Sequence, residues 1–336
     1  VAICNFLLAD EAGTSFSKPD EAIADFDLTE QDFLYRWERG MTIPIHCGLF
    51  QRRILTGFDP DARAKEDWLF WVGLSLGGAR FAYVHGHWAI YRQHPASMRR
   101  SYLRMGQAWL EAGVKINARL QGREPLFFAR TVDWFERCYR ANPAYAEEVR
   151  DLQRAEAGAR VSISPDRGDS VRHDPAVLLA ALPVGEGRTP QFSILVPVFN
   201  HYEYLEDCLL SLLSQEGADA EIICIDDASS DPRVADYLRA LVGRHPRLQV
   251  LLKASNRGIS AVQNEAAACA RGDYLVFVDC DDALEAGALA RLMVEIDHHP
   301  EVDYFFTDRI DVDASGKTLR LAPYGGYDGL SFRDQR

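Results

Sequence analysis

A repeated pattern of short apolar strand followed by amphipathic helix begins at residue 191, and it limits the possible folds of this chain more than any other feature. Four apolar runs, at 192–196, 221–225, 248–252 and 274–278, have the length of buried strands. Between and after the first two runs, apolar residues recur at helical spacing. This alternation predicts βαβ units and therefore a doubly wound α/β fold with a mostly parallel, mixed sheet.

The rest of the chain divides into three further parts. We expect residues 101–157 to form a helical connecting segment, because their apolar residues have helical spacing and prolines at 125 and 143 punctuate them. Residues 158–190 have the composition of a linker. Together with 1–100 and 191–336 this gives four regions, and a length of 336 residues suggests two domains or one domain with a sizeable helical attachment.

The charge balance restricts the partners. The chain has 37 Lys and Arg against 50 Asp and Glu, a net charge of −13, which disfavours a broad electrostatic contact with nucleic acid or anionic lipid. We therefore expect no nucleic-acid partner. No apolar run is long enough for a membrane span, and the seven scattered cysteines contain no C-x-x-C pair. These features favour the cytoplasm, either free or at the inner face of the membrane.

Three carboxylates follow the fourth predicted strand in the sequence FVDCDDAL, namely Asp279, Asp281 and Asp282. Carboxylates this close repel one another unless a cation or a donor lies between them. A divalent metal that bridges a diphosphate would remove that cost. The alternative is that one Asp caps a helix at 283–296, although a cap needs only one. An EF-hand is excluded, because its sixth position is Leu284 and its twelfth is Ala290.

Polar residues also follow the other strands, at the edge where a doubly wound sheet binds its ligand. Asp226 and Asp227 precede a Ser-rich turn, where an ordinary Asx turn is the alternative. Pro197, Phe199 and Asn200 end the first strand, and they could offer an aromatic face and an amide to a base or form a plain strand-to-helix turn. A further loop could meet phosphate or ribose at a helix start, or simply cap that helix, through Asn256, Arg257, Gly258 and Asn264.

The ordered set SILVPVFN, IDDASSD, NRGISAVQNEAA and FVDCDD resembles the family 2 glycosyltransferases, over about residues 192–313. The resemblance implies the GT-A fold, with Phe199 as a wall of the base pocket and Asp227 hydrogen-bonded to a uracil or thymine ring. Asp279 and Asp281 match the outer residues of the DXD motif, the first near ribose and metal, the second as the direct metal ligand. The implied nucleotide-sugar site is Pro197, Phe199, Asn200, Asp227, Asn256, Gly258, Asn264 and Asp279.

A second signature of the same family lies near the other end of the chain. The segments IPIHCGLFQRRIL, GFDPDARAKEDWLFW and YRQHPASM resemble its acceptor-binding half. The resemblance implies that Asp67 is the general base and that His94 completes the metal shell. It assigns acceptor binding to His46, Glu66 and Trp68. The residue types alone are equally compatible with two acids that open a helix and a tryptophan that belongs to the core.

The function implied by the resemblance is that of an inverting, metal-dependent glycosyltransferase. Its donor would be a UDP- or dTDP-sugar held with Mn or Mg, and its acceptor a saccharide or lipid-linked saccharide in surface polysaccharide synthesis. A non-catalytic module that binds nucleotide sugars is the main alternative. A nucleotidylyltransferase is disfavoured, because PVFNHYEY stands where that class needs a Gly-rich loop.

The acceptor half precedes the donor half, so we expect a part of a tandem transferase with two incomplete domains. A gapless echo between residues 6–16 and 309–319 suggests a sharper hypothesis, in which the halves pack as one circularly permuted domain.

Two other motifs are set aside. SGKT at 315–318 lacks the first glycine of a P-loop and predicts a hairpin turn, and HGH at 85–87 is weak evidence for zinc.

Overall fold

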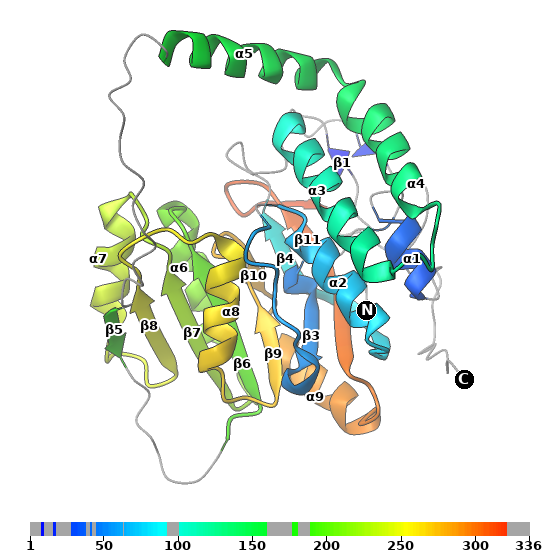
Figure 1. Ribbon diagram of the computed structural model, residues 1–336. Coiled ribbons are helices and arrows are strands. Elements are labelled where there is room, and N and C mark those ends of the chain that lie inside the picture. The colour runs from blue at the N-terminus through cyan, green and yellow to red at the C-terminus, as the bar shows by residue number, and fades with distance from the viewer. Residues whose placement is uncertain are drawn as a thin grey trace.

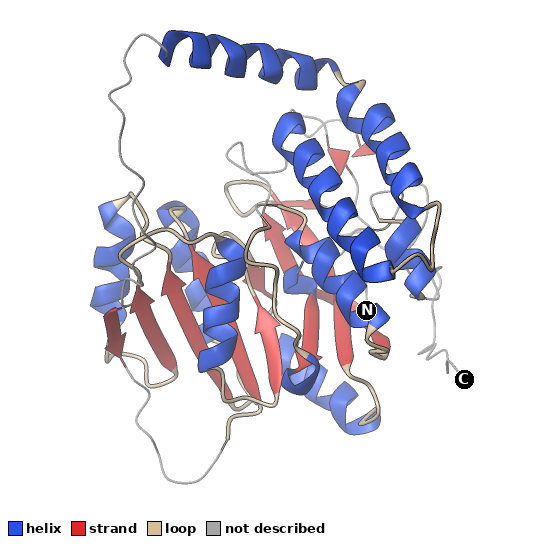
Figure 2. Ribbon diagram, in the orientation of Figure 1, coloured by secondary structure: helices blue, strands red, loops and turns tan. Residues whose placement is uncertain are grey.

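A single mixed sheet forms the centre of the computed structural model, which describes residues 8–9, 16–17, 28–37, 41, 45–62, 64–92, 101–159, 177–180 and 189–320. Helices lie on both faces of this sheet (Figures 1 and 2). The ten strands, in chain order, are β3 (Gly48–Gln51), β4 (Phe81–Arg92), β5 (Val177–Ala180), β6 (Phe192–Val198), β7 (Ala220–Asp226), β8 (Leu248–Leu252), β9 (Tyr274–Phe277), β10 (Ala283–Leu284), β11 (Tyr304–Val312) and β12 (Thr318–Arg320).

The described part of the chain also contains helices in both halves. These are α1 (Glu30–Tyr35), α2 (Glu66–Leu76), α3 (Tyr102–Leu120), α4 (Phe127–Trp134), α5 (Pro143–Ala159), α6 (Tyr202–Leu213), α7 (Pro232–Leu241), α8 (Ile259–Cys269) and α9 (Ala288–His298). Short 3-10 turns, η2 (Ile45–Cys47) and η3 (Arg52–Ile54), flank β3, and a π-helical turn, η5 (Phe135–Arg140), follows α4. None of these helices combines the length and the apolar character that a bilayer crossing requires.

The predicted fold class is confirmed. β4, β6, β7, β8, β9 and β11 run in one direction, and β3, β5, β10 and β12 run in the other. All four strands predicted after residue 191 are present, and helices are present in the predicted connecting segment. The helix expected directly after Asp282 is a correction, because Ala283–Leu284 pairs with β4 and the helix begins at Ala288.

Strands from the two ends of the chain alternate in this sheet. Its order is β10-β4-β11-β3-β9-β6-β7-β8-β5. β3 joins the second half through antiparallel pairing with β9, and β11 lies between β3 and β4. Tyr304 at the start of β11 is therefore paired with Phe50 on one side and Phe81 on the other. Backbone hydrogen bonds across these pairs make one continuous sheet from two segments that are distant in sequence.

Each face of the sheet has its own apolar core, because successive side chains of a strand point to opposite faces. Along β6, Ile194 and Val196 pack with α6, α7 and α9, whereas Leu195 packs with the opposite core, which includes α2, α3 and α8. Rings from both ends of the chain meet in that second core. Phe50 of β3 stacks on Phe277 of β9 at a centroid distance of 5.3 Å.

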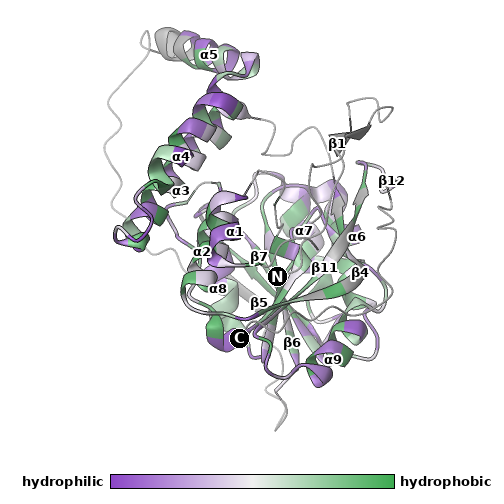
Figure 3. Cartoon of the chain, turned by 90° about the vertical axis from the view of Figure 1, so that its right-hand side faces the viewer, coloured by the Kyte–Doolittle hydropathy of each residue, from purple (hydrophilic) through white to green (hydrophobic). Residues whose placement is uncertain are grey.

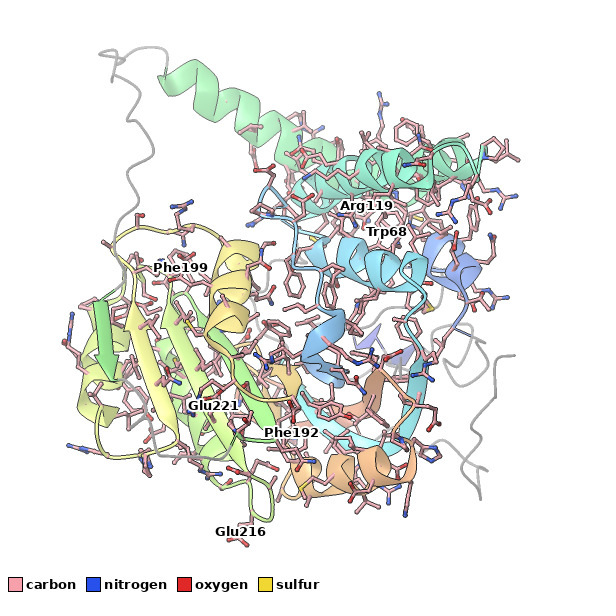
Figure 4. All side chains as sticks on the ribbon, turned by 60° about the horizontal axis from the view of Figure 1, so that its bottom comes forward. Trp68, Arg119, Phe192, Phe199, Glu216 and Glu221 are labelled. Carbon is pink, nitrogen blue, oxygen red and sulfur yellow. The ribbon has the colours of Figure 1, made fainter. Side chains whose placement is uncertain are left out.

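The helical connecting segment packs on the outside of α2. Trp109 of α3 stacks on Trp68 of α2 with ring centroids 4.2 Å apart, and Arg119 donates to the carbonyl of Leu69 over 3.0 Å. Figure 4 shows Trp68 and Arg119 in this contact region. Helix α5 extends away from the body of the molecule (Figures 1 and 3). Phe127 of α4 also lies beside Trp68, with ring centroids 6.1 Å apart, so both α3 and α4 reach the sheet domain.

The echo in the sequence has a structural counterpart. The short strands β1 (Leu8–Ala9) and β2 (Phe16–Ser17) pair antiparallel, with Leu8 opposite Ser17. In β11 and β12, Asp311, which corresponds to Leu8 in the echo, lies opposite Arg320, and Ser17 and Arg320 each stand one residue beyond the echo. The turn expected at SGKT is confirmed, since Asp313 and Lys317 are joined by a backbone hydrogen bond of 3.0 Å. Strand β5 lies within the predicted linker and pairs with β8.

Candidate functional site

The ends of β6, β7 and β9 form one polar edge of the sheet, because these neighbouring strands are parallel. Phe199 follows β6 and is 45% exposed, which is unusual for a ring next to a fully buried strand (Figure 4). The next residues, Asn200 and His201, have positive φ angles of 63° and 56°. The chain therefore turns sharply after β6 and leaves the Phe199 ring open to solvent.

Asn200 holds the neighbouring loop after β7. Its Oδ1 accepts hydrogen bonds from the backbone N–H of Ser230 and Asp231, at 2.9 and 3.2 Å. Its own N–H donates to Ser229 Oγ over 2.7 Å. Ser229 in turn donates from its N–H to Asp226 over 3.1 Å. Asn200 thus positions the loops at this edge, and the nucleotide-binding role predicted for it remains a prediction.

Asp227 joins the end of β7 to the loop before α8. Its two carboxylate oxygens accept from the N–H groups of Arg257 and Gly258, both at 2.8 Å. Asn256 donates to the Asp227 carbonyl over 3.2 Å. Gly258 needs its φ of +85° to make this turn. Burial raises the pKa of Asp227 and the two N–H donors partly offset this, so three predicted site residues form one bonded unit.

The loop after β9 contains the densest group of possible metal ligands. Among the described residues, one ligand atom each from His46, Asp279 and Asp282 lies within 4.8 Å of the others. His46 Nδ1 is 2.9 Å from Asp282 Oδ2, close enough for an ion pair although the two are not aligned as a good hydrogen bond. Asp279 Oδ1 is buried and has no hydrogen-bond partner in the described structure. Such an oxygen fits a cation ligand.

Electrostatics favour a cation at this position. Burial, followed by the charges of Asp282 and Asp281, raises the pKa of Asp279 well above its usual range. Burial also raises the pKa of Asp282. Burial acts against a charged His46, but the nearby Asp282 carboxylate outweighs it and raises the pKa of the ring. A divalent ion would stabilise the ionised carboxylates that burial disfavours.

Arg92 at the end of β4 holds the same loop from the first half of the chain. Its backbone N–H donates to Asp282 Oδ1 over 2.7 Å, and its Nε donates to the carbonyl of Asp281 over 3.0 Å. The guanidinium also reaches Asp207 of α6 at 3.2 Å and lies 4.9 Å from the ring centre of Tyr204. One buried side chain therefore connects β4, the carboxylate loop and α6.

Two further carboxylates, Glu66 and Asp67, begin α2 beside this loop. Burial and the charge of Asp67 raise the pKa of Glu66 to about 7. Burial raises the pKa of Asp67, and the positive charge of Lys65 partly offsets this. The charge of Glu66 contributes to the raised pKa of Asp279, so the predicted base region and the predicted metal region are electrostatic neighbours.

The structure places the remaining predicted residues as follows. Trp68 is fully buried, and its Nε1 donates to the carbonyl of Phe33 over 2.8 Å, so it packs in the core and offers no face to an acceptor. Asn264 bonds both backbone groups of Phe58, at 2.7 and 2.8 Å. Pro197 lies buried within β6. His94 lies outside the described residues.

Two features of the site are not predicted by the sequence. The family resemblance implies that His46 binds the acceptor, whereas in the structure this ring lies against Asp282. Arg92 has no predicted role, although it holds the loop of Asp281 and Asp282. The contact partners of both residues are far away in the sequence, since β4 pairs with β10 beside Arg92 and β3, which follows His46, pairs with β9 and β11.

A doubly wound sheet with carboxylates at the carboxyl ends of its strands defines a ligand-binding α/β protein. Residues 193–333 match the model of glycosyl transferase family 2. The chain is 36% identical over 138 residues to the O-antigen biosynthesis protein RfbC of Myxococcus xanthus, covering 41% of this chain and 11% of that protein. The recognition of family 2 from its ordered motifs is thereby confirmed.

Other relatives agree with this assignment. The hyaluronan synthase of Pasteurella multocida is 28% identical over 213 residues, which cover 62% of this chain and 20% of that enzyme. The chain therefore spans a small part of the length of these relatives. Among solved structures, S. aureus TarS is similar at 29% identity over 33% of each chain, with a TM-score of 0.29. A score this low carries no structural argument.

Proposed function

We propose that this chain forms the catalytic unit of an inverting glycosyltransferase that moves a sugar from a nucleoside diphosphate sugar to a saccharide acceptor. The single observation that supports this most is that two pairs of carboxylates, one from each half of the chain, are electrostatic neighbours. Asp279 and Asp282 follow β9, whereas Glu66 and Asp67 begin α2, and the charge of Glu66 acts on Asp279. A transferase needs both a place for the leaving diphosphate and a base for the acceptor.

The nucleotide is proposed to bind along the ends of β6 and β7. The exposed Phe199 ring offers a stacking face to a base. Asp227 accepts one hydrogen bond on each oxygen, so each oxygen can accept another. A pyrimidine N–H is a suitable donor, which is why we propose a UDP- or dTDP-sugar. Neither Asp227 nor Phe199 discriminates between the two.

Asp279, Asp281 and Asp282, with His46, are proposed to hold the divalent cation. Carboxylate oxygens suit Mg or Mn, and imidazole nitrogen suits Mn better than Mg. When bound, the cation would supply charge neutralisation for the leaving nucleoside diphosphate. Arg92 keeps the loop that carries these ligands in place. The role of Asp281 as a direct ligand rests on the family resemblance, since the three close ligand atoms belong to its neighbours.

Asp67 is proposed as the general base that takes the proton of the acceptor hydroxyl, with Glu66 beside it. The pKa of Asp67 is raised by burial, which makes its carboxylate a stronger base than an exposed one. The relatives act in polysaccharide synthesis, so a saccharide or lipid-linked saccharide of the cell surface is the proposed acceptor. Inversion is the outcome that a single displacement at the anomeric carbon requires.

Calorimetric titration with UDP and dTDP, with and without Mn²⁺, tests the donor site. We expect metal-dependent binding by the unaltered chain and a loss of at least about tenfold in Asp279→Asn and Asp281→Ala, because each removes a proposed cation ligand. Asp236→Asn is the matched control, because Asp236 pairs with exposed Arg239 on α7, away from the proposed cation site. Equal affinity in all four proteins would contradict the assignment of the cation site.

Asp67→Asn separates catalysis from binding. We expect it to bind UDP and Mn²⁺ as the unaltered chain does, and to release UDP from UDP-sugars about 10² to 10⁴ times more slowly when an oligosaccharide acceptor is present. Binding without any turnover in the unaltered chain, across a panel of UDP- and dTDP-sugars and acceptors, would favour the alternative of a non-catalytic nucleotide-sugar-binding module.

A further inference from the structure

A buried lysine precedes the two carboxylates of α2. Lys65 is only 6% exposed and stands at the N-cap of α2 with φ 60° and ψ 19°, in the left-handed region. For a residue with a side chain this conformation is strained, and glycine would avoid the strain. The backbone thus has a left-handed conformation at Lys65, and the charged side chain of this residue is buried in the protein interior.

Two aromatic rings of the helical connecting segment enclose the ammonium group. Lys65 Nζ lies 5.9 Å from the ring centre of Trp109 on α3 and 5.8 Å from that of Tyr139 on η5. Cations are attracted to the faces of such rings at these distances. The Trp109 ring is itself fixed, since it stacks on Trp68 and its Nε1 donates to the carbonyl of Thr131 over 3.0 Å.

The charged partners of this ammonium are the carboxylates of the proposed base. Burial lowers the pKa of Lys65 to about 8, and the charges of Asp67 and then Glu66 act in the opposite direction. Burial, followed by the charges of Cys138 and Asp67, raises the pKa of Tyr139, so Asp67 acts electrostatically on one of the two rings that enclose the lysine. A buried ammonium is tolerated in a protein interior when carboxylates offset the cost of its burial.

The other ionisable groups around the pair come from three directions. Arg104 of α3 acts on Glu66, Tyr102 acts on Tyr139, and Asp279 lies on the side of the carboxylate loop. Of these, Arg104 is a second cation and Asp279 adds negative charge. Lys65 is the cation that acts on both Glu66 and Asp67.

We propose that Lys65 is a positioning residue for the base, whose ammonium, held by the Trp109 and Tyr139 rings, keeps Asp67 ionised and fixed in place. The proposal rests on the transferase function proposed above. It also makes α3 and η5 part of the active site, because these elements supply the two rings. The helical connecting segment then acts on catalysis without touching the substrate.

Lysine NMR tests the pairing without any substrate. The chain has five lysines, Lys18, Lys65, Lys115, Lys253 and Lys317, so ¹³Cε labelling gives a simple spectrum, in which Lys65→Arg identifies the Lys65 signal by removing it. We expect this signal to titrate near pH 8 in the unaltered chain. In Asp67→Asn it should titrate about one pH unit lower, because a stabilising negative charge is lost.

Asp59→Asn is the matched control, since Asp59, in the loop before α2, pairs with Lys115 of α3 over 2.9 Å. It should leave the titration of the Lys65 signal unchanged. A Lys65 signal that ignores Asp67→Asn, or that moves equally in both variants, would overturn the pairing. This result is independent of donor binding and turnover, so it is distinguishable from a failure of the proposed transferase function.

The pH dependence of turnover tests the consequence for catalysis. In Lys65→Met the acidic limb of kcat for UDP release should move to higher pH by about one unit, since Asp67 loses the charge that favours its ionised form. KM for the UDP-sugar should stay within about twofold. Lys65→Arg should restore the profile, and Lys115→Met should leave it unchanged. A uniform loss of kcat at every pH in Lys65→Met, or an unmoved limb, would overturn the proposal. If Lys65→Met fails to fold, the titration of the Lys65 signal in Asp67→Asn still tests whether Lys65 and Asp67 interact.

Discussion

At the scale of single residues, this molecule concentrates negative charge where it is costly. Glu66, Asp67, Asp279 and Asp282 all have raised pKa values, and burial is the first cause for each. Such groups bind protons more readily in the folded state than in the unfolded state. Their contribution to stability is therefore present at low pH and is lost as the pH rises through the folded-state pKa.

This sign gives a prediction for the metal-free chain. Between about pH 4.5 and 7, the window set by Glu66, the contribution of this residue to the free energy of unfolding should fall as the pH rises. Glu66→Gln cannot ionise, so it should show a smaller fall across this window and be the more stable protein at pH 7.5. Urea unfolding at pH 5.0 and 7.5 measures both quantities. Parallel pH dependence in the two proteins would argue against an ionisation of Glu66 in this range.

The sequence predicted some of these residues and not others, for a physical reason. Asp279 and Asp227 follow buried strands directly, so their place in the chain indicates that they lie at the ligand edge of the sheet. His46 depends on its contact with Asp282 in the loop after β9, and Lys65 depends on contacts with α3 and η5. The periodicity of apolar residues and the spacing of motifs predict local structure. They do not predict which side chains from distant parts of the sequence will surround a charged group such as the Lys65 ammonium.

At the scale of elements, the second half of the chain is tied to the first through α8. Both polar atoms of the Asn264 side chain bond the backbone of Phe58, which is buried. Gly57, with φ +81°, brings the loop to within 3.2 Å of Asn264 Oδ1, measured from the position that a Cβ would occupy. The Asn264 side chain therefore links α8 to the loop before α2 by two hydrogen bonds, as a residue of a neighbouring β-strand would do.

Asn264→Ala should destabilise the protein by about 2 to 4 kcal/mol, because it leaves a buried N–H and a buried carbonyl of Phe58 without partners. Chemical denaturation measures the difference in the free energy of unfolding. Asn117→Ala is the matched control, since Asn117 is exposed on α3 and alanine is the better helix former. Equal effects at the two positions would mean that water satisfies the Phe58 backbone after the substitution.

The elements themselves were the most predictable part of the molecule. Strands with continuous apolar sequence, such as β6 and β7, are buried on both faces and could be found from composition alone. The sequence Ala283–Leu284 is compatible with a helix start or a strand, and local sequence favours the helix. The antiparallel pairing with β4 makes it the strand β10. β5 is short and its sequence was interpreted as linker, although β8 offers it an edge to pair with.

At the scale of the whole molecule, the sheet depends on strands from both ends of the chain. β11 has β3 on one side and β4 on the other. Its residues Tyr304, Phe305 and Phe306 are almost fully buried. Without the first half, these rings would lose their neighbours in both cores.

We therefore predict that residues 1–159 and 189–336, produced separately, do not unfold cooperatively, and that mixing them restores one cooperative transition. Thermal unfolding followed by circular dichroism, with size-exclusion chromatography of the mixture, measures this, and the intact chain is the reference. A cooperative transition of 189–336 alone at the midpoint of the intact chain would mean that β3 and β4 contribute nothing to its stability.

The position of β11 between β3 and β4 also has a consequence for synthesis. A ribosome makes β3 and β4 more than two hundred residues before β11, so the nascent chain first presents two strands whose common neighbour does not yet exist. Long separations of this kind slow folding and leave apolar edges open. The helices of the connecting segment are synthesised next. The packing of α3 on α2 buries part of the apolar surface of the early chain before β11 is made.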